Sequence, residues 1–544
     1  MNYSLSKKKA DASFASVNTG EANSTCKQEK DIKLQDAAAA ASKSIPADKP
    51  VVSSDSLPSR FKFSSGVLKN GKPVLNYTNS ISFPNPSEYS SLPGVTSFRG
   101  NNYRNSASYG FVDVKEKKLE KVWSFKTGFL DTWTGVGWTG QPAIVKWDSD
   151  MLKIMNINSS KKGKSELKEI IYATLDGNIY FLDLDDGQPS RLPIDTEAPH
   201  KGSVAVDPRG YPLLFAGQGI DEVGGKQVDI GYRIFSLINQ QLLYFINGLD
   251  PDTFRWWGAF DSSGLLDKKT DTFIECGENG ILYNIKLNTD FDRNMALISI
   301  KPDITKYRYH YQSPYGGEKL GMENSPAIYK NYIYFTDNSG LLQCVDLNTL
   351  STVWLRNVTD DTDSSLAIDE TGEGNVSLYT ACEVDLRGKD DLSYVRKINA
   401  LTGELIWEKG IPCIYDENVN GGSLGSPVIG KKDIRNLVIF SIAKTGRTNA
   451  GKLIAFDKKN GEEVWVINLQ NYTWSSPVDV YTGDGKSYII ICDASGYMYL
   501  IEGISGKILD RIYLEGNIEG SPAVYENMIV VGTRGQKIWG IKIK

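Results

Sequence analysis

The stretch that decides the fold is Ser325-Pro326-Ala327-Ile328 with the segments that follow it: Ile333-Tyr334-Phe335-Thr336, Ser339-Gly340, Leu342-Gln343-Cys344-Val345-Asp346 and Thr352-Val353-Trp354-Leu355. The stretch consists of short apolar runs separated by segments that contain Gly or Asn. Runs of this length, bounded by turn residues, are typical of β-strands. The stretch therefore predicts four consecutive strands, the last of which carries a tryptophan.

The same order recurs along the chain. It runs from Ser426-Pro427 to Val464-Trp465, and again from Ser476-Pro477 to Gly506-Lys507-Ile508. Eight starts of the innermost strand can be found, three of them degenerate: Gln141-Pro142, Gly202-Ser203, Gly258-Ala259, Ser325-Pro326, Ser364-Ser365, Ser426-Pro427, Ser476-Pro477 and Ser521-Pro522. Short strands in a repeated unit of four describe the blades of a propeller. We predict an all-β, eight-bladed β-propeller.

The two ends of the repeat region complete one another. After Ser521 the sequence supplies three strands and stops at Lys544, whereas Leu119 to Phe125 has the pattern of an outer strand before the first full blade. The N-terminal strand is therefore predicted to close the last blade. The tryptophans that share one repeat position are predicted to pack between blades; they are Trp123, Trp354, Trp407 and Trp465.

Composition divides the chain into three parts. Residues 1–60 are rich in Ser, Ala, Lys and Asp and almost lack aromatic residues, so we predict a disordered polar tether. Residues 61–117 show no periodicity and are predicted to be an extended lead-in that packs on the propeller, which occupies residues 118–544. The tether resembles the spacer that follows a removed signal or anchor, which favours an extracytoplasmic or cell-surface location.

Charge and composition exclude several classes of protein. A net charge of -5 gives no positive field for nucleic acid, and no apolar run is long enough to span a membrane. Six cysteines in 544 residues form no dense disulfide framework, and two histidines make a zinc site improbable. We therefore expect a monomer without metal or cofactor.

The repeat resembles the quinoprotein-like (PQQ-like) propeller repeat, which occurs in pyrroloquinoline-quinone dehydrogenases and in the outer-membrane assembly lipoprotein with an eight-bladed propeller. The segment from Val95 to Arg104 also resembles a lead-in of uncharacterised PQQ-repeat proteins of clostridial type. The resemblance covers residues 118–544 and implies the fold. It does not decide the function, because this fold hosts both enzymes and scaffolds.

The enzyme hypothesis is a PQQ- and calcium-dependent dehydrogenase. Enzymes of that family carry a disulfide between two adjacent cysteines and a calcium ion held by Glu, Asn and Asp. The sequence has no adjacent cysteine pair, and Glu323-Asn324 would mimic only part of the calcium set. A hydrolase has still less support, because His200 and His310 are the only imidazoles and no nucleophile-elbow motif occurs.

The sequence favours a non-catalytic binding or scaffolding module with a peptide, protein or glycan ligand. Loops that enter the inner strands meet on one face of a propeller, and here they carry aromatic and polar residues that suit recognition. The alternative is a pure scaffold, in which the blade sides or outer edges bind a protein partner and the axis holds no ligand. The residues predicted to line an aromatic funnel are Trp133, Trp138, Trp256, Trp257, Tyr311, Glu323, Asn324, Asn418 and Trp474.

Overall fold

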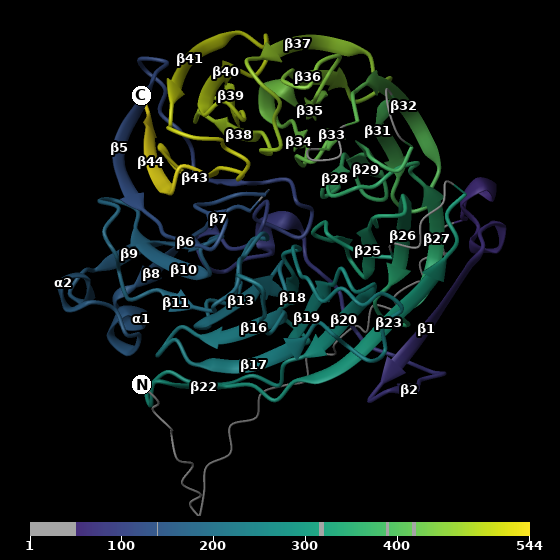
Figure 1. Cartoon of the computed structure of the whole chain (residues 1–544), viewed down its shortest axis with the longest axis horizontal. Helices are drawn as coiled ribbons and strands as arrows, with labels where there is room; N and C mark the ends of the chain where they lie inside the picture. Colours follow the sequence, from purple (N-terminus) through teal and green to yellow (C-terminus); the bar gives the residue numbers. More distant parts are fainter. Residues whose placement is uncertain (1–50, 139, 315–319, 388–390, 416–419) are drawn as a thin grey trace, which may run out of the picture. The chain divides into compact units, whose positions relative to one another are not determined.

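The computed structural model of the chain describes residues 51–138, 140–314, 320–387, 391–415 and 420–544. All of these belong to the unit Pro50–Lys544. The described residues form eight antiparallel blades of four strands around one axis (Figure 1). The prediction of an all-β, eight-bladed β-propeller is confirmed.

The strands of each blade follow one another from the axis outward. The first blade contains β8 (Ala143–Asp148), β9 (Glu166–Ala173), β10 (Asn178–Asp183) and β11 (Ile194–Asp195), and the second contains β12 (Ala205–Val206), β13 (Leu213–Gly217), β16 (Gly231–Ser236) and β17 (Leu242–Asn247). The third contains β18 (Leu265–Asp267), β19 (Thr272–Cys276), β20 (Ile281–Lys286) and β23 (Asp303–Tyr311), and the fourth contains β24 (Ala327–Tyr329), β25 (Tyr332–Phe335), β26 (Leu341–Asp346) and β27 (Ser351–Asn357).

The second half of the ring repeats this order. The fifth blade contains β28 (Ala367–Glu370), β29 (Val376–Ala381), β31 (Leu392–Asn399) and β32 (Leu405–Pro412), and the sixth contains β34 (Val428–Ile429), β35 (Leu437–Ala443), β36 (Gly451–Asp457) and β37 (Glu463–Leu469). The seventh contains β38 (Val478–Tyr481), β39 (Ser487–Cys492), β40 (Tyr497–Glu502) and β41 (Ile508–Tyr513), and the eighth contains β42 (Ala523–Tyr525), β43 (Met528–Thr533), β44 (Lys537–Ile543) and β5 (Leu119–Lys126).

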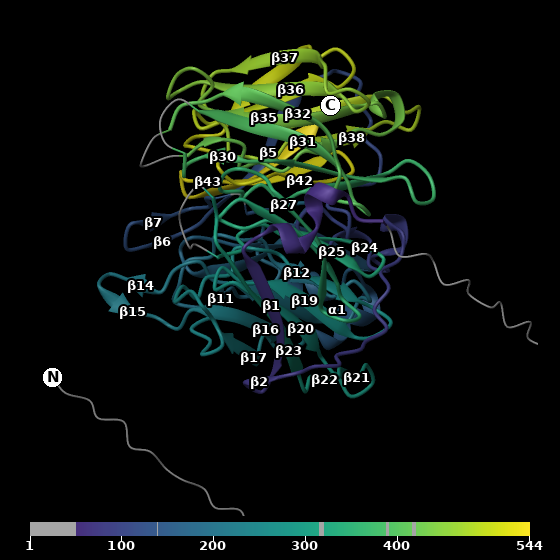
Figure 2. The same cartoon turned by 90° about the vertical axis from the view of Figure 1, so that its right-hand side faces the viewer.

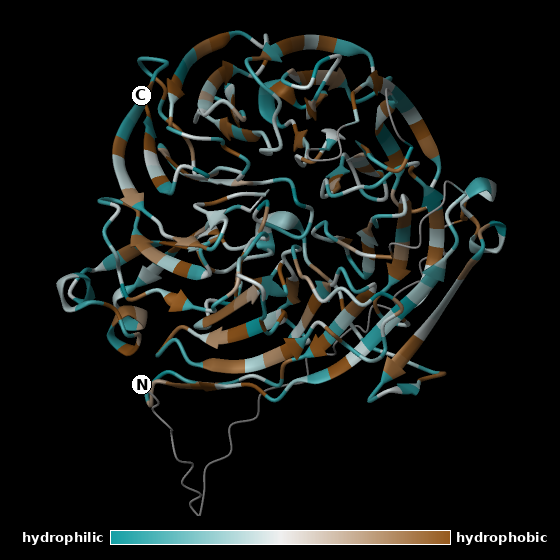
Figure 3. Ribbon diagram, viewed as in Figure 1, coloured by the Kyte–Doolittle hydropathy of each residue, from teal (hydrophilic) through white to brown (hydrophobic). Residues whose placement is uncertain are grey.

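Burial explains why the inner and outer strands differ in sequence. Strands β13 and β35 are buried throughout and read as apolar runs, because both of their faces pack against other blades. The outer strands β5 and β41 keep exposed positions between less exposed ones. Figure 3 shows the same distribution, with hydrophobic residues concentrated in the strands and hydrophilic residues interspersed along the rim.

The eighth blade closes as predicted. Strand β5 pairs antiparallel with β44, from Lys126 opposite Lys537 to Leu119 opposite Ile543, and Trp123 faces Gly540. The outermost strand of this blade therefore comes from the N-terminal side of the repeats, and its other three strands come from the C-terminal end. Segments far apart in the sequence are thus joined by a hydrogen-bonded ladder, and the ring is closed at this point.

The repeated tryptophans make one contact four times. Each indole Nε1 donates to a backbone carbonyl of the following blade, at 2.9 to 3.1 Å; the pairs are Trp123 with Leu184, Trp354 with Ala400, Trp407 with Lys458 and Trp465 with Gly503. Each ring also covers a turn glycine with positive φ, where a Cβ would meet the indole at 2.5 to 2.8 Å; these are Gly187, Gly403, Gly461 and Gly506. The prediction of inter-blade packing is confirmed.

The segment 94–109, called here the axial segment, occupies the axis of the ring. Its strand β3 (Gly94–Val95) pairs with the inner strand β8, and its strand β4 (Ser108–Tyr109) pairs in parallel with β42. Between them Arg99 and Arg104 are buried, and their guanidinium groups donate to carbonyls of Pro427, Pro477 and Pro326. The axis is therefore filled by polypeptide that hydrogen-bonds to several blades.

The inner strands share one register, which corrects one predicted start. The backbone N–H before one strand donates to the hydroxyl at the same position of the next blade, as from Ser263 to Ser325 and from Ser325 to Ser365. In the third blade this position is Ser263, and β18 begins at Leu265. The predicted start Gly258-Ala259 was therefore wrong by several residues, because the loop after β17 is longer than in other blades.

The lead-in packs on the outside of the ring before it reaches the axis. Strand β1 (Phe63–Lys69) adds to the outer edge of β23 and continues into β2 (Lys72–Pro73). The 3-10 turns η1 (Ser54–Ser56) and η2 (Pro58–Arg60) precede it, and the Ser56 hydroxyl donates to the Gly403 carbonyl. The packed lead-in therefore includes residues 51–60, which the sequence assigned to the tether.

The remaining elements are short insertions. They are the helices α1 (Ser149–Ile154) and α2 (Ser159–Lys162), the 3-10 turns η3 (Pro86–Glu88) and η4 (Lys432–Ile434), and the pairs β6 (Phe129–Leu130) with β7 (Trp133–Thr134), β14 (Glu222–Val223) with β15 (Lys226–Gln227), β21 (Asp290–Asp292) with β22 (Leu297–Ser299) and β30 (Glu383–Val384) with β33 (Gly421–Gly422). Within the described ranges, no helix has the length and apolar character needed to cross a bilayer.

Candidate functional site

One face of the ring collects two kinds of connection: those that lead from an outer strand to the next inner strand, and those that join the second and third strands of a blade. We call it the loop face. The hairpins β6–β7 and β14–β15 belong to these connections and project on the same side in Figure 2. Loops held by a rigid scaffold commonly carry function.

The repeat register decides which residues surround the axis on this face. In each blade one residue lies two positions before the shared Ser or Gln that opens the inner strand. Among the described residues these are Lys201, Asp261, Glu323, Asp363, Leu424, Trp474 and Glu519. Four of these seven residues are carboxylates, and only Glu323 and Trp474 were in the set predicted from the sequence.

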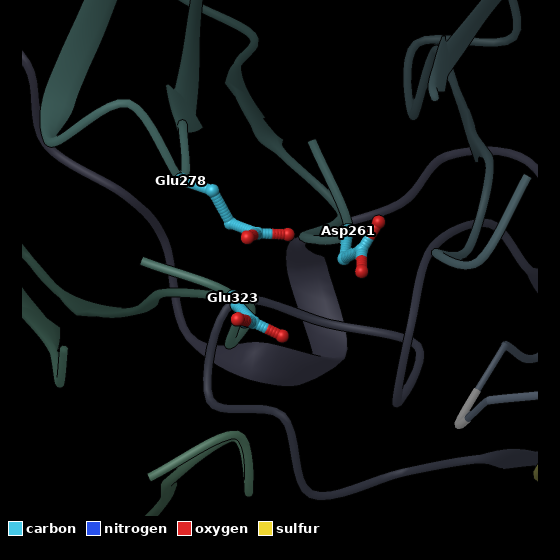
Figure 4. Close-up of side chains that lie close together, drawn as sticks. All are labelled: Asp261, Glu278 and Glu323. Atoms are coloured by element: carbon cyan, nitrogen blue, oxygen red, sulfur yellow. The ribbon is translucent and has the colours of Figure 1, made fainter. Parts of the chain in front are cut away.

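Two groups of carboxylates lie on the loop face, and together we call them the acidic cluster. The first consists of Asp261, Glu278 and Glu323, each of which has an oxygen within 4.8 Å of the others, and Figure 4 shows their side chains close together. The second consists of Asp361, Asp363 and Glu383 and meets the same distance limit. Glu278 lies in the β19–β20 turn, so its carboxylate reaches the axis from the neighbouring loop position.

Burial and mutual repulsion raise the pKa values of Asp261, Glu278 and Glu383. Burial raises the pKa of Asp261 to about 6, and Glu323 adds to the rise while Lys201 opposes it. Burial also raises the pKa of Glu278, with further contributions from Glu323 and Asp261. In the second group burial raises the pKa of Glu383 to about 8, and Glu323 contributes again. Glu323 therefore links the two groups electrostatically.

The aromatic residues of the loop face form a separate cluster. The Trp138 and Trp474 rings meet edge to face with centroids 5.4 Å apart, and Tyr472 lies 5.8 Å from Trp474. The Trp474 indole donates to the Asn420 carbonyl, and the Lys201 ammonium lies 4.5 Å from the Trp138 ring. The structure thus brings together Trp138 and Trp474, both predicted to line a funnel, and they pack on one another more than they line a space.

The structure assigns other roles to two predicted site residues. Tyr311 is only 2% exposed and packs in the core between the third and fourth blades. The Asn324 amide donates to the carbonyls of Thr336 and Thr362 at 2.7 and 3.0 Å, and so ties the fourth blade to the loop before the fifth. The predicted funnel therefore does not include these two side chains.

The remaining predicted residues occupy different loops of the face. Trp133 lies half-buried in β7, and Trp257 is half-buried before β18. Trp256 is 71% exposed. Asn418 lies outside the described residues.

A quinone cofactor with the calcium set of the dehydrogenases does not fit these residues. The sequence has no adjacent cysteine pair, and the five described cysteines, Cys276, Cys344, Cys382, Cys413 and Cys492, are separate buried thiols. Asn324 would correspond to the asparagine of that calcium set, but its amide donates hydrogen bonds to two backbone carbonyls. We derive no reaction through a quinone.

These features define the class of the protein: it is an eight-bladed β-propeller built from PQQ-like repeats, with carboxylates and aromatic rings on its loop face. A family model described as outer membrane protein assembly factor BamB matches residues 449–544. A relative with the same name from Shewanella oneidensis is 26% identical over 263 residues, which are 41% of this chain and 61% of that protein.

Two further comparisons concern a second relative and a solved structure. The outer membrane protein assembly factor BamB of Kangiella koreensis is 28% identical over 85 residues, which are 15% of this chain and 21% of that protein. The chain therefore covers less than two thirds of either relative. The quinohemoprotein alcohol dehydrogenase of Comamonas testosteroni superposes with a TM-score of 0.52 at 12% identity, over 83% of this chain and 80% of that chain. This likeness establishes the fold alone.

The raised pKa values predict how stability depends on pH. The folded-state values of about 6 for Asp261 and about 8 for Glu383 lie above those of unfolded chains, about 3.9 and 4.3. The folded protein therefore binds more protons than the unfolded chain in this range, so these groups stabilise it at low pH and lose that contribution as pH rises through the folded-state values. We expect the free energy of unfolding, measured with denaturant in a chelating buffer, to fall between about pH 5 and pH 8.

The variant Asp261→Asn/Glu383→Gln is the control for this pH dependence. It removes both titrating groups and keeps the side-chain shapes. The slope of stability against pH is expected to flatten in this variant. An unchanged slope would place the titration elsewhere in the molecule, for example at the buried Glu275, whose pKa burial raises to about 8.

Proposed function

We propose that the protein is a non-catalytic binding propeller that holds a protein or peptide partner on its loop face. The observation that carries this proposal is the exposure of large aromatic side chains on loops of that face. Phe129 in the β6–β7 hairpin is 68% exposed, and Trp256 before β18 is 71% exposed. Exposed aromatic anchors of this kind dominate the binding energy of protein interfaces.

The partial match to outer membrane protein assembly factors supports a scaffold over an enzyme. It also supports an extracytoplasmic location, as inferred from the tether. The acidic cluster supports a partner with positive charge, because its carboxylates give the same loop face negative potential. A peptide that combines aromatic or aliphatic residues with Lys or Arg fits both features.

Binding of a peptide library and a glycan array to the full chain tests this proposal. Phe129→Ala and Trp256→Ala should each weaken the selected peptides by a factor of about 10 or more, because each removes an anchor ring. Phe111→Ala is the matched control. Phe111 is 60% exposed, but it follows β4 and lies next to Val112, which bonds to Tyr481 at the far end of an inner strand.

The outcomes separate the possible ligands. Peptide binding that is lost in the two loop-face variants and kept in Phe111→Ala supports the proposal. Equal loss in all three variants, or binding of glycans alone, would overturn the assignment of a protein or peptide partner to this face.

A further inference from the structure

The first group of the acidic cluster differs from the ion pairs that stabilise the rest of the molecule. Both oxygens of Asp261 and the Oε1 atom of Glu278 are buried and have no hydrogen-bond donor among the described residues. The side chain of Asp261 is only 2% exposed. Burying an ionised carboxylate without close partners carries a large free-energy cost, which either a proton or a bound cation relieves.

The cations of the protein do not supply that charge at close range. Lys201 Nζ lies 3.7 Å from Asp261 Oδ2, and Arg255 Nη2 lies 3.7 Å from Glu278 Oε2. Charge-assisted hydrogen bonds close to about 2.7–2.9 Å.

Buried pairs elsewhere in the chain do close to such distances, as between Arg191 and Glu169 at 2.7 Å and between Lys306 and Asp250 at 2.6 Å. The two cations near the first group are therefore ion-pair neighbours of its carboxylates that do not close to hydrogen-bond distance.

Each carboxylate of the group has one outward partner. Lys201 faces Asp261, Arg255 faces Glu278, and the Asn338 amide donates to Glu323 Oε1 at 2.6 Å. In metal centres such partners hold one oxygen of a carboxylate and leave the other to the ion, and among these three only the Asn338 amide lies at hydrogen-bond distance. Figure 4 shows the three side chains close together on separate segments of the chain.

We propose that Asp261, Glu278 and Glu323 form a calcium-binding centre on the loop face. Their oxygens lie within 4.8 Å of one another, which is about twice a calcium–oxygen distance of about 2.3–2.6 Å. The ligands are all oxygens, as hard cations prefer, and calcium accepts irregular geometry that magnesium does not.

The ion would join two blades. Asp261 and Glu278 come from the third blade and Glu323 from the fourth, so one ion would fix the loops before β18 and β24 and the β19–β20 turn together. The proposal goes beyond partner binding and stands without it, because the exposed rings of Phe129 and Trp256 do not belong to the group. This ligand set also differs from one that contains an asparagine, since Asn324 is turned away.

Isothermal titration of calcium into the chelator-treated full chain tests the proposal, together with melting temperatures with and without calcium. The wild-type protein is expected to bind one calcium ion in this centre and to melt at a higher temperature with calcium, because the ion binds the folded state. Magnesium at the same concentration should raise the melting temperature less.

The variant Asp261→Asn/Glu278→Gln should bind calcium at least about 30-fold more weakly, because two of three charged ligands are lost. Without calcium it should melt at or above the wild-type temperature, since the amides remove repulsion between buried carboxylates. This second measurement distinguishes loss of a ligand from loss of the fold.

Glu519→Gln is the matched control. Glu519 occupies the same register position in the eighth blade and faces Arg534 at 3.7 Å, but it is not part of the group. It should retain the calcium affinity of the wild-type protein. No calcium-dependent rise in melting temperature in the wild type, or an undiminished rise in the double variant, would overturn the proposal.

Discussion

Removal of residues 1–126 is expected to abolish the cooperative unfolding transition of the propeller. This deletion takes away β5, which is the outer strand of the eighth blade, and the axial segment that hydrogen-bonds to the inner strands. The eighth blade would then expose the edge of β44, and the ring would lose its closure. Circular dichroism and thermal melting report the loss, and removal of residues 1–50 is the control, which should melt within a few degrees of the full chain.

A point variant tests the contribution of strand β5 to stability separately from that of the axial segment. Trp123→Ala removes an indole that bonds to Leu184 and covers Gly187 and Gly540. Truncation of a large packed aromatic side chain typically costs about 3–5 kcal/mol. Val122→Ala, at the neighbouring exposed position of the same strand, should cost less than about 1 kcal/mol. Similar losses in the two variants would contradict the role of Trp123 in joining the ring.

The closure could be predicted because the signals for it are local. A strand pattern with a tryptophan at a fixed distance from a turn glycine is visible in any one blade, so a missing fourth strand near Lys544 and an extra one at Leu119 are both apparent. The degenerate blades show the limit of such counting. The third blade has a long loop before Ser263. The pair Gly258-Ala259 lies in that loop but resembles the residues that open an inner strand.

The axial segment could not be placed from the sequence. Its residues have neither the alternation of a strand nor the period of a helix, because they contact inner strands from the first, second, fourth and fifth blades in turn through single hydrogen bonds. Val206, Ile328 and Ile368 each donate from an inner strand to a carbonyl of this segment. Contacts of this kind depend on the closed ring and leave no periodic trace.

Of the acidic cluster only Glu323 was predicted, and its other members were missed for a different reason. Acidic residues are common in loops, and Asp261 or Asp363 alone reads as a solvated side chain. The signal that would have found them is the repeat register, since both lie two residues before the serine that opens an inner strand. Aromatic residue type alone indicated Trp138 and Trp474, which are neighbours in the structure, but it also indicated the core residue Tyr311.

The second large effect is expected at Arg104. Its guanidinium donates to the carbonyls of Pro326 at 2.8 Å and Phe98 at 2.7 Å, and also to the carbonyl of Ser263. The side chain is completely buried, and burial lowers its pKa to about 10, which leaves it charged at neutral pH. One side chain thus satisfies carbonyls from the axial segment and from the third and fourth blades.

Arg104→Ala should therefore lower the free energy of unfolding by at least about 3 kcal/mol, because each buried carbonyl left unpaired costs about 1–3 kcal/mol. Arg104→Lys should recover little of this loss, since an ammonium group cannot reproduce the planar set of donors that reaches three acceptors. Arg435→Ala, at an exposed position whose guanidinium bonds only to the Lys432 carbonyl among the described residues, should change stability by less than about 0.5 kcal/mol. Denaturant unfolding of the three variants measures these differences. If Arg104→Lys were as stable as the wild type, the charge alone would matter, and the ring would not depend on the hydrogen bonds through which the axial segment joins its blades.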